Sequence, residues 1–153
     1  MNRRGYLAGL AGASIATFIG YTALGDPDGA LLGSTEYDIG MSRNAFEPTR
    51  YETTVGEPVV WKNTSEAYHT VTAYESAIFD EEGATYFATG GYNDEETARA
   101  AYWDRMGGSL ATRETYEHTF EVPGTYSYFC VPHEIDGNGD VKMVGSVVVE
   151  ESE

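Results

Sequence analysis

Between residues 34 and 150 the sequence contains seven short runs of alternating or consecutive apolar residues, separated by turn residues. Runs of this length are typical of β-strands, and several of them at close spacing within the length of one domain predict two packed sheets. We therefore expect an all-β fold, an antiparallel Greek-key β-sandwich. Its strands are expected at residues 35–41, 50–55, 58–62, 69–74, 115–121, 125–130 and 144–149.

A long connection, residues 75–114, interrupts the strand series and contains the one helical pattern. The pattern covers residues 94–106, where Asn93 can cap the first turn, Glu96 stands in the capping-box position, and a Gly-Gly pair follows the last turn. We expect one short helix here, and we expect the connection to cover one end or flank of the sandwich.

The charge of the chain excludes one large class of partner. The sequence has 9 Lys and Arg residues against 25 Asp and Glu residues, a formal net charge of −16. Such a chain repels phosphate backbones, so we expect no nucleic-acid partner. The acids are spread along the chain, which favours a solvated surface over a binding patch. This spread is similar to that of proteins from salt-loving archaea, and an ordinary acidic secreted domain is the alternative.

Residues 1–25 differ in composition from the rest of the chain. Arg3 and Arg4 precede an uncharged segment, residues 6–24, and together they resemble a twin-arginine export signal. At about 1.5 Å per residue, the same segment could also just span a bilayer as an anchor. We expect a cleaved signal or a retained membrane anchor, and a domain outside the cytoplasm. The expected division is residues 1–25 as signal or anchor, 26–33 as linker, and 34–153 as the folded domain.

The single cysteine, Cys130, limits the kinds of site that the chain can build. One thiol excludes an intrachain disulfide, a tetrathiolate zinc site and a cluster that needs several thiolates. Tyr126, Tyr128 and Cys130 alternate onto one face of a strand, so the thiol is expected to point inward at the strand's end. His133 follows three residues later. A thiolate with an imidazole suits a borderline-soft transition metal, but these two ligands alone do not complete the coordination of a metal ion.

The remaining ligands must come from elsewhere in the chain. His69 begins an apolar strand just after a turn, which places it at a sheet end where a ligand fits. His118 lies within a strand, and we interpret it as a partly buried structural residue. Met143 precedes the last strand, where its thioether could be a weak axial ligand, whereas Met41 and Met106 are expected in the core. Two imidazoles, one thiolate and a distant thioether are the ligands of blue-copper electron-transfer sites.

With these motifs the chain resembles the plastocyanin group of small blue copper proteins, and most closely its haloarchaeal members, the halocyanins. The upstream motif consists of Trp61-Lys62-Asn63 and then His69-Thr70-Val71. The C-terminal motif consists of Tyr126-Ser-Tyr128-Phe-Cys130-Val-Pro132-His133 and then Met143-Val-Gly145 with a valine-rich strand.

The resemblance implies a cupredoxin-like fold and one copper ion, Cu(I) or Cu(II), held by His69, Cys130, His133 and Met143. It also implies a one-electron carrier, not an enzyme, that shuttles electrons to or from membrane-bound respiratory redox proteins. In such a carrier His133 would be the electron port, reaching the surface through an apolar patch. We further expect a monomer.

Two features depart from the family's pattern. Thr70 stands where the family usually has an asparagine that ties the two ligand loops together, and a hydroxyl can replace part of that bond. Nine residues separate the last histidine from the methionine, a longer loop than is common, so an altered reduction potential is expected. Asp136, Asn138 and Asp140 in this loop alternate with glycines like the start of a calcium loop, but no acid stands at the twelfth position. We interpret the loop as a turn.

Other functions could use the same residues. The alternative that we keep is an extracytoplasmic copper-binding or delivery protein, although an inward-pointing Cys130 favours retention of the metal. A zinc site is compatible with the ligand types and would be colourless. A cysteine nucleophile with His133 as its base lacks a third group to orient the imidazole.

Overall fold

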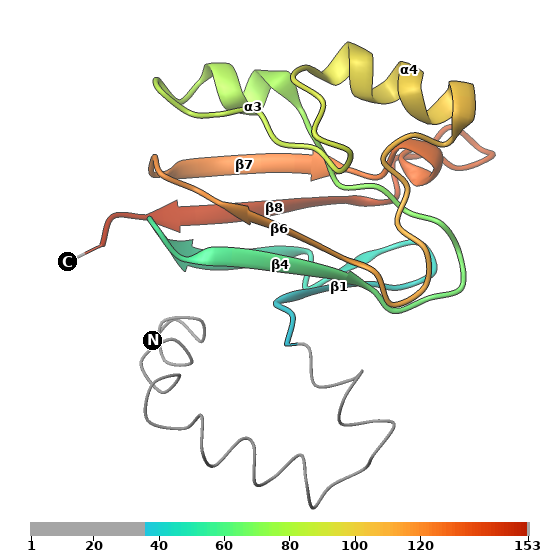
Figure 1. Cartoon of the computed structure of the whole chain (residues 1–153), viewed down its shortest axis with the longest axis horizontal. Coiled ribbons are helices and arrows are strands. Elements are labelled where there is room, and N and C mark those ends of the chain that lie inside the picture. Colours follow the sequence, from blue (N-terminus) through green and yellow to red (C-terminus); the bar gives the residue numbers. More distant parts are fainter. Residues whose placement is uncertain (1–35, 153) are drawn as a thin grey trace, which may run out of the picture.

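Two four-stranded sheets pack against each other and enclose the core of the domain (Figure 1). The computed structural model describes residues 36–152. One sheet has the strand order β2-β1-β4-β6 and the other has the order β3-β8-β7-β5, so the predicted β-sandwich is confirmed. The strands are β1 (Ile39–Met41), β2 (Phe46–Glu47), β3 (Arg50–Thr54), β4 (Pro58–Asn63), β5 (Thr72–Ala73), β6 (Thr115–Thr119), β7 (Gly124–Phe129) and β8 (Val144–Glu150).

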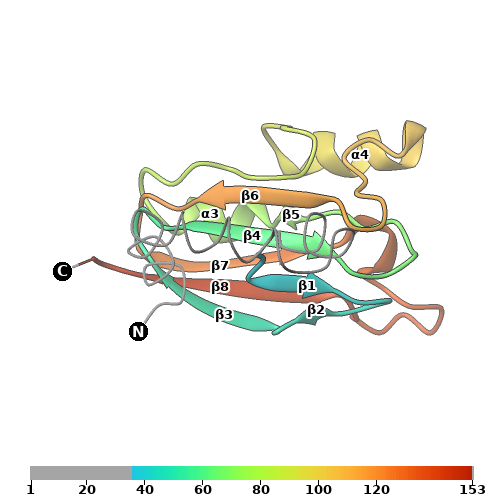
Figure 2. The same ribbon diagram turned by 60° about the horizontal axis from the view of Figure 1, so that its bottom comes forward.

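Two strand pairs of the predicted antiparallel Greek-key sandwich are parallel. β1 runs parallel to β4, and β3 runs parallel to β8, whereas the other named pairs are antiparallel (Figure 2). The reason is topological. Parallel neighbours need a crossover connection, and here the chain visits the opposite sheet between the two members of each parallel pair.

The core lies between the sheets and is rich in aromatic rings. Trp61 of β4 is fully buried and meets Tyr128 of β7 edge to face, with ring centroids 5.4 Å apart. Gly145 faces this ring, because a Cβ built on it would lie 2.7 Å from the Tyr128 hydroxyl. The glycine of the Met-x-Gly motif therefore makes room for a core tyrosine. Along β8 the burial alternates, with Val147 and Val149 facing inward.

The connection between β5 and β6 contains two helices, α3 (Glu75–Phe79) and α4 (Glu95–Arg105). The helix expected at 94–106 is confirmed as α4, whereas α3 was not predicted. The cap of α4 is Asp94 and not Asn93, since the Asp94 carboxylate accepts a 2.7 Å hydrogen bond from the Thr97 amide. α3 packs against β7, whereas α4 packs against β5 and lies at the end of the sandwich at which β7 ends (Figure 1).

Two methionines were both expected in the core, and only one is there. Met41 is fully buried, as expected. Met106 is 41% exposed, which corrects the expectation, because it is the left-handed residue (φ 59°) that ends α4 at the surface.

The expected signal or anchor at residues 1–25 and the linker at 26–33 lie outside the described residues. Within residues 36–152, no helix is both long enough and apolar enough to cross a bilayer.

Candidate metal centre

Three side chains from two distant segments of the sequence meet at the end of β7. The Cys130 sulfur lies 3.5 Å from Nδ1 of His69 and 3.4 Å from Nδ1 of His133. The donor atoms of the three residues all lie within 4.8 Å of one another. Three of the four predicted ligands are thus brought together by the fold, and within residues 36–152 they are the one such group of His, Cys, Asp or Glu side chains.

Cys130 is fully buried at the position that strand alternation predicts. Burial raises the pKa of its thiol to about 11, although hydrogen bonds from the Thr70 and His133 backbones act in the opposite direction. The Thr70 amide donates to the sulfur at 3.4 Å. A thiolate in this site therefore needs a positive partner, which a bound metal ion supplies.

His69 is fully buried, and the side chain of Ser65 contacts the ring nitrogen that faces away from the cysteine. The Ser65 hydroxyl lies 3.0 Å from Nε2, so the lone pair of Nδ1 can point toward Cys130 when Nε2 carries the proton. Burial, together with the nearby His133, lowers the pKa of His69 to about 4, while a hydrogen bond to the Ser42 backbone raises it. The imidazole is therefore neutral near pH 7, the state in which it binds metals.

Ser65 is a functional residue that the sequence reasoning missed. Its position depends on Asn63, whose side-chain oxygen accepts hydrogen bonds from the Ser65 amide and hydroxyl at 2.9 and 2.8 Å. The Asn63 side-chain nitrogen donates to the Ala67 and Leu110 carbonyls. The only sequence signal for this role was the position of Ser65 in a turn just before His69, and a serine in a turn has many possible roles.

Thr70 ties the two ligand loops together, as its hydroxyl was expected to do. Its Oγ1 accepts a 2.9 Å hydrogen bond from the Val131 amide and lies 3.0 Å from the Thr72 hydroxyl. Because Thr70 follows one ligand and Val131 follows another, this bond fixes the distance between the two segments.

His133 is half-buried at the end of a short 3₁₀ turn, η1 (Val131–His133). Burial lowers its pKa. The turn is closed by a 3.1 Å hydrogen bond from the His133 amide to the Cys130 carbonyl. The second imidazole therefore lies between the buried sulfur and the surface.

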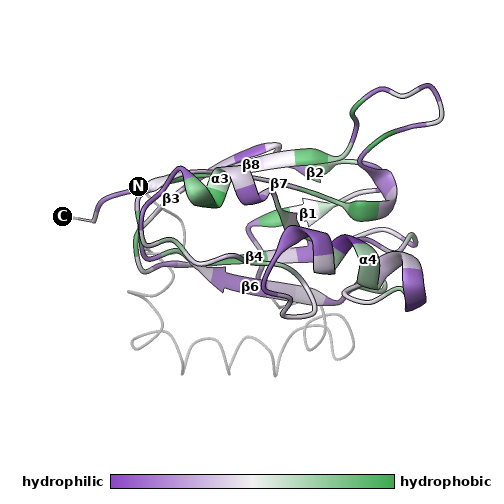
Figure 3. Ribbon diagram, turned by 90° about the horizontal axis from the view of Figure 1, so that it is seen from above, coloured by the Kyte–Doolittle hydropathy of each residue, from purple (hydrophilic) through white to green (hydrophobic). Residues whose placement is uncertain are grey.

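The long loop before Met143 does not displace that residue. The Met143 amide donates to the His133 carbonyl, and the Cys130 amide donates to the Met143 carbonyl, both at 3.1 Å. The inserted residues form a hairpin closed by a bridge between Ile135 and Val141, which projects beyond the sandwich and is hydrophilic at its tip (Figure 3). Met143 is fully buried, and its backbone is hydrogen-bonded to the backbones of Cys130 and His133.

The Asp136–Asp140 segment is a hydrogen-bonded turn, which agrees with its interpretation. One Asp136 oxygen accepts bonds from the Asn138 and Asp140 amides at 2.8 and 2.9 Å, and the other lies 3.5 Å from the Lys142 ammonium group. The aspartate is therefore occupied by its own loop.

His118 is not part of the donor group, as expected. Its ring stacks on Phe87 with centroids 4.7 Å apart and an interplanar angle of 21°. Burial lowers its pKa to about 4. Its environment is that of a partly buried structural residue, as predicted.

The donor set fits one borderline-soft transition-metal ion. One sulfur and two imidazole nitrogens converge at short range, and the calcium-type oxygen ligands that a hard cation needs are absent from this group. A buried sulfur with two imidazole nitrogens close to it matches three of the four ligands of a blue-copper site.

Comparison with known proteins agrees with this chemistry. Residues 34–150 match the family described as copper binding proteins, plastocyanin/azurin family. The plastocyanin of Scenedesmus fuscus is 30% identical over 105 residues, which cover 69% of this chain and 86% of that protein. Amicyanin-alpha of Methylorubrum extorquens is 29% identical over 150 residues, which cover 98% of this chain and 100% of that protein.

Among solved structures, an oxidised amicyanin mutant has a TM-score of 0.51 with this structure at 23% identity, covering 79% of this chain and 88% of that chain. This likeness concerns the fold, and it confirms the expected cupredoxin-like sandwich.

Proposed function

The chain belongs to the plastocyanin/azurin family of copper-binding proteins, and from that premise we propose that it shuttles electrons to or from membrane-bound respiratory redox proteins outside the cytoplasm. The family match and the relatives establish the general class of the protein and its cofactor. The protein is a blue copper electron carrier and not an enzyme, and its cofactor is a single copper ion of type 1.

We assign His69, Cys130, His133 and Met143 as the copper ligands. The observation that carries this assignment is the Cys130 sulfur, which lies 3.5 and 3.4 Å from Nδ1 of two histidines. Copper supplies the one-electron chemistry, since it is stable as Cu(I) and Cu(II) with these ligands. The electron comes from a reduced donor protein and goes to an oxidised acceptor protein.

The protein's own residues keep the ligands in place between the two oxidation states. Ser65 and Thr70 hold the loop of His69, and the backbone bonds of Met143 hold the end of the ligand loop. Small changes in ligand positions mean a small reorganisation cost, which favours fast transfer. Complete burial of Cys130 and Met143 keeps bulk water from them.

We assign the electron port to His133, the half-buried ligand. The hairpin that follows it pairs Ile135 with Val141, residues that are 48% and 64% exposed and can contact an apolar partner surface. Docking should then depend little on salt at high concentration, because at about 1 M the screening length falls to roughly 3 Å. If the rates of electron exchange with a membrane partner fall steeply between about 1 M and 3 M salt, docking through an apolar surface is contradicted.

We place the protein in the halocyanin group, at the outer face of the cell membrane or secreted, as a monomer. The support is the even distribution of 25 acids, the twin-arginine-like start and the uncharged segment 6–24. An acidic surface remains solvated in concentrated brine.

The test is to load the purified protein with copper and record its visible spectrum. Intense blue absorption that disappears with ascorbate is expected, and Cys130→Ser should abolish it while the protein still folds. Respiratory membranes from the source cells should then reduce or reoxidise the copper-loaded protein faster than the respiratory chain in those membranes turns over. A blue protein that exchanges no electrons with such membranes, but transfers copper to an apo-acceptor, would instead identify a delivery protein.

A further inference from the structure

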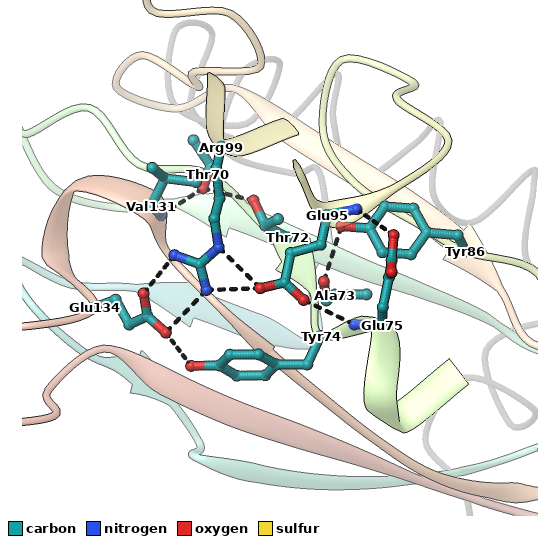
Figure 4. A network of polar contacts seen from close by, with 10 residues as sticks. All are labelled: Thr70, Thr72, Ala73, Tyr74, Glu75, Tyr86, Glu95, Arg99, Val131 and Glu134. Carbon is teal, nitrogen blue, oxygen red and sulfur yellow. Dashed lines mark hydrogen bonds and ion pairs between the residues drawn. The ribbon is translucent and has the colours of Figure 1, made fainter. Parts of the chain in front are cut away.

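Glu134 directly follows His133, and both of its carboxylate oxygens accept hydrogen bonds from other side chains. Arg99 of α4 donates from Nη1 to one oxygen at 2.7 Å and from Nη2 to the other at 3.2 Å. The Tyr74 hydroxyl donates to the second oxygen as well (Figure 4). The Glu134 side chain is only 14% exposed, and a bidentate pair shielded in this way is among the stronger polar contacts in proteins.

The same guanidinium group also covers the residue before Cys130. The Arg99 guanidinium carbon lies 4.0 Å from the centroid of the Phe129 ring. Tyr74 packs against Phe129 too, with ring centroids 4.4 Å apart. One arginine thus contacts the sequence neighbours of two copper ligands.

Arg99 is itself fixed by the long connection between β5 and β6. Its Nε donates to Glu95 at 2.8 Å. Glu95 and Glu75 each accept a 2.9 Å hydrogen bond from the other's backbone amide, so α3 and α4 cap each other (Figure 4). The chain of contacts therefore runs from the two helices to the ligand loop.

We propose that Arg99 is a positioning residue for electron transfer, which acts through Glu134 and Phe129 to hold the turn that carries His133 in one conformation. The need for such a residue follows from the turn itself. η1 has three residues, and 3₁₀ turns of this length have weak hydrogen-bond geometry. The inference rests on the proposed role of His133 as a copper ligand, and it assigns a function to the helical connection.

The first experiment needs no copper. Hydrogen exchange of the His133 and Met143 amides is measured by NMR in the copper-free protein, in the wild type and in Arg99→Met. Arg105→Met is the matched control, because Arg105 lies on the same helix with a side chain that is 90% exposed. We expect both amides to exchange about tenfold faster in Arg99→Met, since hydrogen bonds to a charged group are lost, and to be unchanged in Arg105→Met.

Further variants separate positioning from folding and from charge. In Arg99→Met, amides of β8 such as Val147 should keep their wild-type exchange rates. In Arg99→Lys, the His133 and Met143 amides should exchange at rates between those of the wild type and Arg99→Met, because a lysine has no planar guanidinium group. Tyr74→Phe keeps every charge and should give a smaller change of the same sign. Wild-type exchange rates of the His133 and Met143 amides in Arg99→Met would overturn the proposal, whatever the result in Tyr74→Phe.

The second experiment uses the copper-loaded protein. Arg99→Met should lower the midpoint potential more than Arg105→Met does, because the freed Glu134 carboxylate favours Cu(II). In the double variant Arg99→Met, Glu134→Gln the charge of the pair is balanced. We expect its potential to return toward the wild-type value while its electron self-exchange remains slower, and wild-type self-exchange would contradict the positioning role. A wild-type protein that binds no copper would refute the proposed function, but the amide-exchange experiment would still test Arg99.

Discussion

The Thr70 hydroxyl accepts a 2.9 Å hydrogen bond from the Val131 amide, although the two residues are 61 positions apart. Thr70 follows His69, and Val131 follows Cys130, so a single bond joins two segments that carry ligands. The Thr70 amide in turn donates to the Cys130 sulfur. The protein therefore holds the distance between these ligands before any metal binds.

Replacing Thr70 with valine should destabilise the protein by about 1–3 kcal/mol, because the buried Val131 amide loses its acceptor. Urea unfolding of the copper-free protein measures this change. Thr70→Ser retains the hydroxyl and is the control, with an expected loss well below that of Thr70→Val. Equal stabilities of the valine and serine variants would show that the hydrogen bond has no net effect.

Replacing Ser65 with alanine should weaken copper binding about 10- to 100-fold, the usual effect of removing a group that orients a histidine ligand. The 3.0 Å contact with Nε2 of His69 is the reason. Competition with a Cu(I) chelator measures the affinity. The control is Ser76→Ala, since Ser76 is exposed on α3. An unchanged affinity in Ser65→Ala would mean that the rest of the loop orients His69.

The hairpin at 135–141 should be removable without loss of the site. The Lys142 amide donates to the Glu134 carbonyl at 2.7 Å, so the two ends of the hairpin are already paired. Replacing residues 135–141 with Asn-Gly, which suits a two-residue turn, should leave the blue absorption band unchanged. Optical spectra of the copper-loaded variant test this. A lost or strongly shifted band would show that the inserted residues shape the metal site.

Replacing Met143 with leucine should raise the midpoint potential, because loss of a weak sulfur donor disfavours Cu(II). Protein-film voltammetry or a redox titration measures it. Met41→Leu is a closely matched control, since Met41 is also a fully buried methionine but belongs to β1. Equal potentials in the two variants would exclude Met143 as a ligand.

His118 should make the protein less stable as the pH falls. Burial lowers its pKa from 6.5 to about 4, so below pH 6.5 the unfolded chain binds a proton that the folded protein does not. Its contribution is complete above about pH 6.5 and is lost progressively toward pH 4. His118→Phe should therefore show a shallower loss of unfolding free energy between pH 6.5 and 4, with its blue band unchanged. The same pH slope in both proteins would contradict this, and loss of the band would make His118 part of the site.

The predicted strands were largely correct because alternation is a local property of the sequence. Residues 144–149 alternate in burial as expected, and β8 covers them with one residue more. β2 and α3 were missed, since two and five residues are too few to show a period. The expected strand at 69–74 is reduced to β5, because His69 leaves the ladder and bridges to Leu110 instead.

The sequence by itself determined the chemistry of the site: residue types and spacing indicated a thiolate, two imidazoles and a thioether, because ligand preference is a property of side chains. Only the tertiary structure decided how those groups meet and what holds them. The parallel pairing of β3 with β8, the contact of Ser65 with His69 and the grip of Arg99 on Glu134 join residues far apart in the chain or separated by a turn. Such contacts depend on how the sheets and the helical connection pack, and no local pattern records that packing.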